Sequence, residues 1–445
     1  MCFSSSNGSQ FRYLLPFLIG AASLIGATSL ISASRAEDWP TWRGANGRGV
    51  ADDSALPSSW NLEGERSNVR WKVELPGPGN SSPIVSNNRV WITQFDKHTG
   101  ARQLRCYDAQ HGKELWTKAF KSEQDEPTHP TNPHCAASPA TDGKHVVAFF
   151  GSAGLCCFNQ DGDLLWEKKL GSPQHLFGQG ASPLIHDDLV TLNYGPGEEQ
   201  FWVTLDLKTG EEKWRIEISK SDAPNPFDAP DGPKLPPGSK LRDPFGTWAT
   251  PVMAQRDGRK ELILAFPKLM QAVDPETGMS KWTCGELGPQ VLSSPFIVDD
   301  TLVCLGSTAM GVRLFGEGDV TDTHRLWFEA QDRPRIGTGI AIDQTIIANT
   351  MQGIIEGIDV QSGKRLWQKR LSSASGGGSW SSLVRCGERV FATNQDGSIY
   401  VFTISPEYKL LATNQLGETT NASPAIAGDC IYIRTDKHLW CIGPA

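Results

Sequence analysis

The sequence contains none of the short motifs that mark the commonest catalytic sites. It has no G-x-S-x-G nucleophile elbow, no H-E-x-x-H zinc motif, no phosphate-binding P-loop and no C-x-x-C-H haem site. Positive charge is also scarce, because 42 lysines and arginines face 50 acidic residues and leave a net charge of −8. This balance argues against nucleic acid or an anionic membrane surface as the partner.

Long apolar runs are scarce too, and the one that occurs lies at the N-terminus. Arg12 precedes an apolar segment from Leu14 to Ile31, which Ser34-Arg35-Ala36 follows. This order is typical of a cleaved signal peptide, so we predict that residues 1–36 are removed. An uncleaved membrane anchor is the alternative, because the apolar segment is long. No cysteine stands at the junction for lipid attachment, so we expect an exported, monomeric protein of the periplasm or cell envelope without a membrane span.

The rest of the chain repeats one motif, seen most clearly from Asp359 to Trp367. Asp359 ends one apolar stretch, Gly363 lies in a polar turn, and Trp367 lies in the next stretch. A strand, a glycine-containing turn and a second strand predict a β-hairpin. The tryptophans of the related second strands are Trp71, Trp116, Trp166, Trp214, Trp282, Trp327 and Trp367.

A second marker, a serine or threonine usually followed by proline, runs in phase with the tryptophans. Each unit reads as four strands in roughly 40–50 residues, which is typical of a propeller blade. Eight markers therefore predict an all-β fold, an eight-bladed β-propeller with four antiparallel strands per blade, over residues 69–445. The markers are Ser82, Ser138, Ser182, Thr250, Ser294, Thr338, Ser382 and Ser423.

The two ends of the repeat complement each other. The last unit stops at Cys441-Ile442 after three strands, whereas residues 68–73, with Trp71, form a tryptophan strand with no blade before it. We therefore expect the N-terminal strand to complete the last blade and close the ring. The repeated indoles are expected to be structural, each buried as a wedge between neighbouring blades.

Residues 37–68 precede the ring and fit neither a strand nor a helix pattern. The segment is rich in glycine and carries Trp39 and Trp42 near its start. We predict an arm that packs across one face of the propeller. The alternative is that Trp42 and Arg43 form part of a binding surface.

Two connections between repeats are unusually long. The first contains His129, His134 and Cys135, which suggest a metal site. Prolines interrupt it and no second cluster has matching spacing, so we predict a surface or channel-mouth loop without metal. The second, from Ser219 to Thr247, is rich in proline and is predicted to overhang the face where one blade leads to the next, a common place for binding.

The residues just before each marker are predicted to converge on the mouth of the central channel. This set mixes polar side chains, one cation and two tryptophans, unlike the apolar filling of a core, and ligands usually bind in concave sites of this kind. A water-filled funnel without a ligand is the alternative. The candidate ligand-binding residues are Asn80, His134, Gln179, Trp248, Gln290, Arg335, Trp380 and Asn421.

All ten cysteines except Cys2 follow the predicted cleavage site. Cys106, Cys157 and Cys441 occupy one position of the repeat where other units have small residues, which predicts a packing role. Disulfides between Cys156 and Cys157, or between Cys430 and Cys441, are the alternatives.

These motifs resemble a known family. The hairpin from Asp359 to Trp367 is similar to the repeat of pyrroloquinoline-quinone (PQQ)-type eight-bladed propellers, and the likeness covers nearly all of residues 69–443. The start, from Trp39 to Gly44 with Asn46-Gly47, resembles the opening of exported bacterial propellers of this family, which are likened to the assembly lipoprotein BamB. The resemblance implies the fold, and for activity it implies either a quinoprotein dehydrogenase or a non-catalytic scaffold.

This sequence differs from the quinoprotein dehydrogenases in several features, and these differences favour the non-catalytic scaffold. The resemblance to them would imply PQQ with Ca²⁺, and Arg335 and Trp380 as cofactor contacts. Those enzymes are longer, with calcium ligands, a catalytic Asp and an adjacent-cysteine disulfide, and no calcium ligand set can be assigned here. We therefore expect a non-catalytic scaffold without cofactor that binds a protein or envelope polymer through its loop-rich face, as in BamB-like envelope assembly. A PQQ-dependent dehydrogenase and a polysaccharide-binding propeller are the alternatives.

Overall fold

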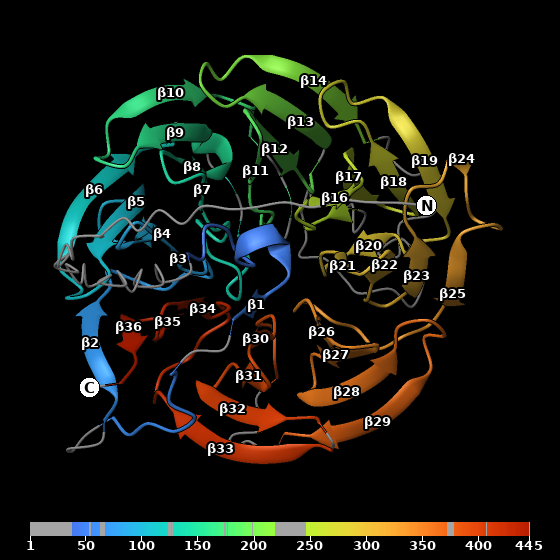
Figure 1. Cartoon of the computed structure of the whole chain (residues 1–445). Helices are drawn as coiled ribbons and strands as arrows, with labels where there is room; N and C mark the ends of the chain where they lie inside the picture. The colour runs from blue at the N-terminus through green and yellow to red at the C-terminus, as the bar shows by residue number, and fades with distance from the viewer. Residues whose placement is uncertain are drawn as a thin grey trace, which may run out of the picture. The chain divides into compact units, whose positions relative to one another are not determined.

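In the computed structural model, eight β-sheets surround a central channel (Figure 1). The structure describes residues 38–444, apart from residues 53–54, 63–66, 123–125, 127, 173–174, 176, 198, 219–245, 372–377 and 406. Each sheet contains one set of four antiparallel strands, so the predicted eight-bladed propeller is confirmed. The helices described are two short 3-10 turns, η1 (Ala45–Gly47) and η2 (Gly151–Ala153).

In seven of the eight blades the strands run in chain order from the channel outward, and in blade 8 the outermost strand comes instead from the N-terminal end of the repeat. Blades 1 and 2 contain β3 (Ile84–Ser86), β4 (Arg89–Asp96), β5 (Ala101–Asp108), β6 (Glu114–Phe120), β7 (Ala140–Thr141), β8 (His145–Phe149), β9 (Leu155–Asn159) and β10 (Leu164–Lys168). Blades 3 and 4 contain β11 (Leu184–His186), β12 (Leu189–Tyr194), β13 (Phe201–Asp206), β14 (Glu212–Glu217), β16 (Val252–Arg256), β17 (Arg259–Phe266), β18 (Leu269–Val273) and β19 (Ser280–Gly285).

The second half of the ring repeats this order. Blades 5 and 6 contain β21 (Phe296–Val298), β22 (Thr301–Cys304), β23 (Ala309–Arg313), β25 (Arg325–Glu329), β26 (Ile340–Ile342), β27 (Thr345–Asn349), β28 (Ile354–Asp359) and β29 (Arg365–Arg370). Blades 7 and 8 contain β30 (Val384–Cys386), β31 (Arg389–Thr393), β32 (Ser398–Thr403), β33 (Lys409–Gln415), β34 (Ala425–Ala427), β35 (Cys430–Arg434), β36 (His438–Ile442) and β2 (Val69–Glu74). Three short additions are β1 (Val50–Ala51) on β30, β24 (Gly318–Asp319) on β19, and β15 (Gly246–Thr247) paired with β20 (Gln290–Val291).

The ring closes through blade 8, where the two ends of the repeat share one sheet. β2 pairs antiparallel with β36, and Trp71 lies opposite Cys441. Figure 1 shows the two strands side by side, the first blue and the second red. The prediction that the N-terminal strand completes the last blade is therefore confirmed. Closure pairs an edge that would otherwise stay open to other chains.

The repeated hairpin is built from an aspartate, a glycine and a bulge. In blade 6, Asp359 accepts a hydrogen bond from the Ser362 backbone N–H at 2.8 Å, and Gly363 has φ +68°. That left-handed conformation favours glycine. The strand register shifts just beyond the turn, as it does in the outer strand pair of all eight blades. The shift re-aims the following tryptophan side chain.

The repeated tryptophans lie at the seams between blades. The indole of Trp166 in blade 2 packs against Gly210 in the turn of blade 3, and its N–H donates to the Leu207 carbonyl at 2.8 Å. A Cβ atom added at Gly210 would lie 2.7 Å from that ring, so the glycine is needed for the close approach. Four other seams have the same pattern, with Trp71 on Gly112, Trp116 on Gly162, Trp214 on Gly278 and Trp327 on Gly363.

The seam between blades 4 and 5 is different. Trp282 donates its indole N–H to the Glu261 carboxylate of its own blade at 2.8 Å. Blade 5 lacks the short glycine hairpin, because the chain between β23 and β25 makes a longer excursion that contains β24. The Phe315 backbone N–H from that excursion donates to the same carboxylate at 3.2 Å. A buried acidic side chain thus takes over the role of the missing backbone carbonyl.

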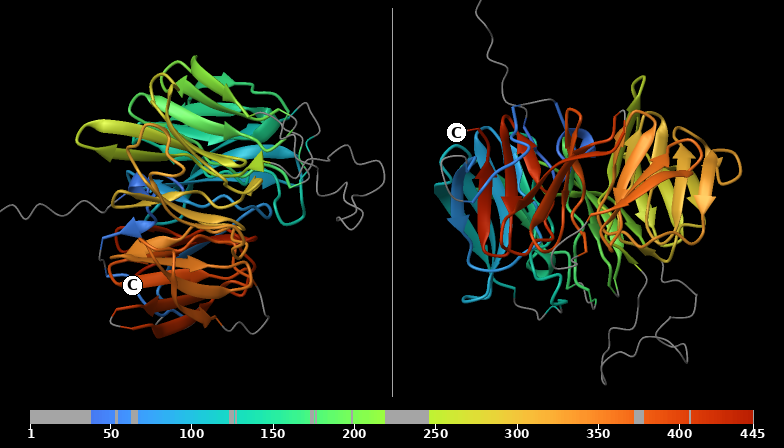
Figure 2. Two further views of the ribbon diagram at one scale, coloured as in Figure 1. Left: turned by 90° about the vertical axis from the view of Figure 1, so that its right-hand side faces the viewer. Right: turned by 90° about the horizontal axis from the view of Figure 1, so that it is seen from below.

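The segment before the ring lies along one face of the propeller. Trp39 pairs with Val85 in the middle of the first strand of blade 1, and β1 runs parallel to the first strand of blade 7. Between these points η1 crosses the centre of the ring (Figure 1), and the edge-on view of Figure 2 shows this blue segment at one face. The arm therefore spans the channel from blade 1 to blade 7.

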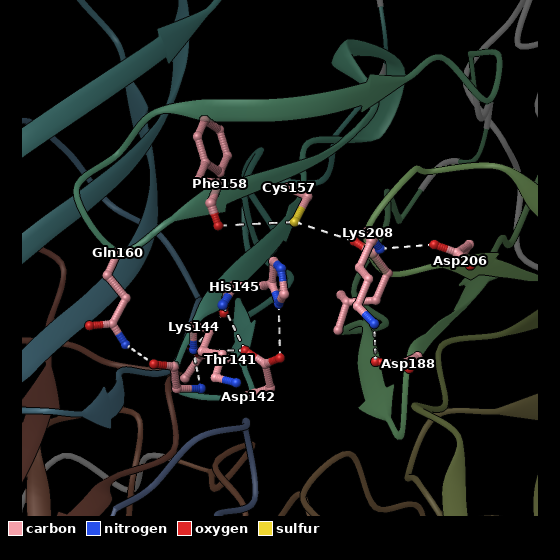
Figure 3. Close-up of polar contacts among 12 residues, drawn as sticks. Thr141, Asp142, Lys144, His145, Cys157, Phe158, Gln160, Asp188, Asp206 and Lys208 are labelled. Atoms are coloured by element: carbon pink, nitrogen blue, oxygen red, sulfur yellow. Dashed lines mark hydrogen bonds and ion pairs between the residues drawn. The ribbon is translucent and has the colours of Figure 1, made fainter.

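The nine cysteines within the described residues are all free thiols and all buried. Cys156 belongs to the core between blades 1 and 2, whereas Cys157 belongs to the core between blades 2 and 3. The Cys157 thiol points at the Leu207 carbonyl, 3.8 Å away in the neighbouring blade (Figure 3). Because neighbouring residues of a strand face opposite sides, these two thiols are directed apart.

Two predicted segments cannot be compared with the structure. The signal peptide (1–36) and most of the proline-rich insertion after Ser219 lie outside the described residues. Within the part of the chain that is described, no helix has the length and apolar character needed to cross a membrane.

Candidate functional site

A cavity of about 490 Å³ occupies the central channel. Its wall is built from the residues that precede the first strand of each blade and from loops that reach over the mouth. Because short first strands of all eight blades meet at the axis, residues that are far apart in sequence face one another there. Five of the eight predicted residues line this cavity, namely Asn80, Trp248, Gln290, Trp380 and Asn421.

The other three predicted residues lie elsewhere. His134 and Gln179 line a small separate pocket beside Cys135. Arg335 is fully buried and ion-paired with Asp332 and Glu356, and Glu356 also pairs with Arg333 at 2.6 Å. Its guanidinium is therefore neutralised inside blade 6 and supplies no positive charge to the cavity. The sequence expectation of a cation at the channel mouth does not match this placement.

The predicted serine and threonine markers form a ring of hydroxyl groups around the channel, which we call the hydroxyl ring. At seven of the eight steps round this ring, one marker's backbone N–H donates to the next marker's hydroxyl oxygen, at 2.8–3.1 Å. At the eighth step the Thr338 hydroxyl donates to the Ser294 carbonyl at 3.3 Å. The members that line the cavity are Ser82, Ser138, Ser182, Thr250, Ser294, Ser382 and Ser423.

The hydroxyl ring has a structural and a chemical consequence. Each bond satisfies a buried backbone N–H that would otherwise lose its partner on leaving water. It also links neighbouring blades at the axis, as the indoles do further out. The seven hydroxyls that accept a marker N–H use only a lone pair for that bond, so each still has its own hydrogen to donate, whereas the Thr338 hydroxyl donates to the Ser294 carbonyl.

The N-terminal arm closes one end of the cavity. Trp42 lines the cavity, and on its other side the arm and the starts of blades 3 to 6 leave only a small second pocket. Arg43 anchors the arm, because its buried guanidinium donates to the Leu383 carbonyl at 2.7 Å and to the Gly339 carbonyl at 2.5 Å. Burial lowers the pKa of the Arg43 guanidinium to about 9. The arm therefore packs on one face, with Trp42 at the cavity and Arg43 buried; that Trp42 belongs to a binding surface stays a prediction.

Aromatic side chains form one wall of the cavity, and their positions are fixed. The Trp248 indole N–H donates to the Gly178 carbonyl at 3.0 Å, and the His175 ring packs against the indole with centroids 5.1 Å apart. Phe177 lies on the same side, with its ring centroid 5.2 Å from that of His129. A rigid aromatic wall can pack against a ligand without losing much conformational entropy.

Amide side chains link the loops at the mouth. Asn80 donates to the Thr131 carbonyl at 2.9 Å and to the Asn132 side-chain oxygen at 3.0 Å. Asn132 in turn donates to the Phe177 and Gln179 carbonyls, both at 2.8 Å. The loop that was predicted near the mouth from its histidines is therefore held by its asparagine, which the sequence analysis did not single out.

The cavity wall carries no carboxylate and no lysine or arginine among the described residues, and His129 is its one ionisable side chain. Elsewhere in the described chain, no three Asp, Glu, His or Cys side chains come together as a metal site would require. Ca²⁺ needs several oxygen ligands, usually carboxylates, and PQQ is itself a polycarboxylate that needs cationic partners. Because Cys156 and Cys157 point into separate cores, no paired thiols face the channel either. The described residues therefore do not fit calcium-bound PQQ.

Known propellers share this architecture. BamB from Moraxella catarrhalis is 13% identical and superimposes with a TM-score of 0.58 over 84% of this chain and 99% of its own. A europium-containing methanol dehydrogenase is 12% identical, with a TM-score of 0.67 over 90% of both chains. Quinohemoprotein alcohol dehydrogenase from Comamonas testosteroni is 12% identical, with a TM-score of 0.66 over 92% of this chain and 81% of its own. At such low identity these likenesses show the fold alone.

Sequence comparison is more specific about the family. No curated protein matches the chain. The profile described as "Outer membrane protein assembly factor BamB" matches residues 67–227 and 247–445, which together form nearly the whole propeller. The interruption coincides with the proline-rich insertion. The chain therefore belongs to the BamB-like family of PQQ-type β-propellers.

Proposed function

We propose that this protein is an exported, non-catalytic scaffold. It binds a protein or polymer of the cell envelope through the loop-rich face that carries the cavity. The cavity carries this proposal, because it is deep, closed at one end by Trp42 and almost free of ionisable groups. General acid–base or nucleophilic catalysis needs such groups within hydrogen-bond reach of a substrate. Binding needs only shape, apolar contact and a few placed hydrogen bonds.

Family membership supports the same function. The matching profile is described as an assembly factor of outer membrane proteins. We propose a role of this kind for the chain, after export to the periplasm and removal of residues 1–36. The structural neighbours also include quinoprotein dehydrogenases. The wall chemistry weighs against that second function, since the described wall offers calcium no carboxylate and offers the quinone's carboxylates no lysine or arginine.

One experiment separates scaffold from dehydrogenase. The purified protein is heated with and without PQQ and Ca²⁺, and dye-linked oxidation of alcohols and sugars is measured in parallel. We expect an unchanged melting temperature and no turnover. Stabilisation by PQQ together with turnover would overturn the proposal.

A second experiment tests the binding face. The immobilised protein is incubated with envelope fractions before and after polysaccharide digestion, and retained material is compared between Trp380→Ala and Gln361→Ala. Trp380 lines the cavity, whereas Gln361 is exposed in a hairpin turn of blade 6. We expect Trp380→Ala alone to reduce retention. Equal retention by both variants would place binding on another surface.

A further inference from the structure

The cavity contains an excess of hydrogen-bond donors, and the hydroxyl ring supplies most of them. Its seven cavity-lining members each accept a backbone N–H from the neighbouring blade. Within the described chain, none of their own hydrogens has an acceptor, although Thr338, the member outside the cavity, does have one. The donors that remain available are therefore those that line the cavity.

Three further donors have no partner among the residues that the structure describes. The indole N–H groups of Trp42 and Trp380 and the side-chain amide of Gln290 all belong to residues of the cavity wall. By contrast, the indole of Trp248 and the amides of Asn80 and Asn132 are bonded to neighbouring loops. The wall thus combines groups that hold the structure with groups that are free to bond a ligand.

These donors restrict the class of ligand. An apolar ligand would cover them without supplying acceptors, which costs free energy for every donor removed from water. An acidic ligand would meet no cation in the described wall, because Arg43 lies beneath Trp42 and is bonded to backbone carbonyls. A ligand that fits must be uncharged, rich in oxygen acceptors and partly apolar, so that it can also lie against the indoles.

We propose that the cavity binds a neutral saccharide, such as the end of an uncharged glycan chain. Sugar hydroxyl and ring oxygens would accept from the hydroxyl ring, Gln290 and the free indole N–H groups, while the C–H face of a sugar ring packs on Trp248 or Trp380. The cavity volume of about 490 Å³ suits an oligosaccharide end rather than a whole polymer. This inference rests on the proposed binding function and names the ligand class of that site.

The test uses the full mature chain and defined sugars. Neutral trisaccharides of glucose, mannose, galactose and N-acetylglucosamine are titrated by isothermal calorimetry, with trigalacturonic acid, the neutral apolar dye N-phenyl-1-naphthylamine and an uncharged tripeptide as comparison probes. Each is repeated with Trp380→Ala, Gln290→Ala and the matched control Gln361→Ala. Gln290 lines the cavity and Gln361 does not.

We expect at least one neutral trisaccharide to bind, with affinity reduced at least tenfold by Trp380→Ala and by Gln290→Ala and unchanged by Gln361→Ala. Thermal melting of each variant verifies that it is folded. Binding of the acidic sugar, the dye or the tripeptide alone would overturn the inference, as would sugar binding that neither cavity variant weakens. If no sugar binds but envelope material is still retained through the cavity face, the saccharide inference fails and the scaffold function stands. If nothing is retained through that face, both fail.

Discussion

Two groups of tryptophans in this propeller, those at the seams and those at the cavity, use the same side chain in different ways. At the seams, an indole such as Trp166 lies on a glycine of the next blade, and its N–H is bonded to a backbone carbonyl. In the channel, Trp380 lines the cavity, and its N–H has no partner among the described residues. The indole N–H of Trp166 is occupied by the protein, whereas that of Trp380 is available to a ligand; Trp248, which also lines the cavity, is intermediate because its N–H is bonded to the Gly178 carbonyl.

This difference shows how a repeat protein can use different positions of its repeat for stability and for binding. Seam tryptophans recur in seven of the eight blades because each blade must be joined to the next, so their signal is strong in the sequence. At the axis, the hydroxyl ring recurs from blade to blade, whereas other cavity residues such as Trp380 and Gln290 occur once. The seam residues therefore hold the blades together, the hydroxyl ring offers similar donors all round the cavity, and the residues that break the period are the candidates for distinguishing one ligand from another.

The largest expected effect comes from removing a seam indole. Trp166→Ala should lower the free energy of unfolding by about 3–5 kcal/mol, because it deletes a large buried ring and leaves a cavity between blades. Trp380→Ala should cost about 1 kcal/mol or less, because its ring is partly exposed. Equilibrium urea unfolding of both variants measures the two values. Equal losses would remove the distinction between the two groups.

Replacing the glycine that packs against a seam indole should give the second-largest loss of stability. Gly210→Ala should lower the free energy of unfolding by about 2–3 kcal/mol, because Gly210 has φ +72° and its new Cβ would meet Trp166. Gly100 is the matched control, with φ +69° and no atom within 4 Å of an added Cβ. Gly100→Ala should cost only the backbone part, about 1 kcal/mol. Similar losses in the two variants would show that the indole contact is not tight.

The hydroxyl ring should contribute less per residue. Ser382→Ala removes the acceptor of the Thr338 backbone N–H, a bond of 2.9 Å, and leaves that buried group unpaired. We expect a loss of about 1–2 kcal/mol. Ser382→Thr keeps the hydroxyl and should retain most of the stability, as threonine occupies the same marker in blades 4 and 6. Destabilisation by both variants would point to crowding rather than to the lost bond.

The smallest effect is a dependence of stability on pH from His186 in blade 3. Burial lowers the pKa of this imidazole to about 4, and its Nε2 lies 2.8 Å from the Thr191 hydroxyl. The unfolded chain binds the proton more readily, so the stabilisation is complete above pH 6.5 and is lost as pH falls towards 4. Between pH 7.5 and 5.5 the wild type should lose about 1 kcal/mol more than His186→Gln. The free energy of unfolding of both proteins is measured by urea unfolding across this pH range. If the two curves against pH run parallel, the pKa of His186 is not lowered.

The sequence predicted the ring well because its period, its tryptophans and its unmatched end strands are all local signals. It also located the hydroxyl ring without explaining it, since the bonds join markers in different blades and depend on how first strands meet at the axis. Arg335 was misplaced because a position just before a marker says nothing about the carboxylates of Asp332 and Glu356, which draw the side chain inward. Trp42 was only an alternative, because an irregular arm has no period from which its path can be inferred.

The shared eighth blade has a consequence for the order in which the molecule is made. The strand at residues 69–74 is synthesised before the other three strands of its sheet, which end at residue 442. During synthesis it has no partner until β36 has been made, so the circle cannot be completed before residue 442 has emerged. A chain that lacked β36 would keep two sheet edges unpaired. We therefore expect it to form an open, aggregation-prone ring rather than a smaller stable propeller.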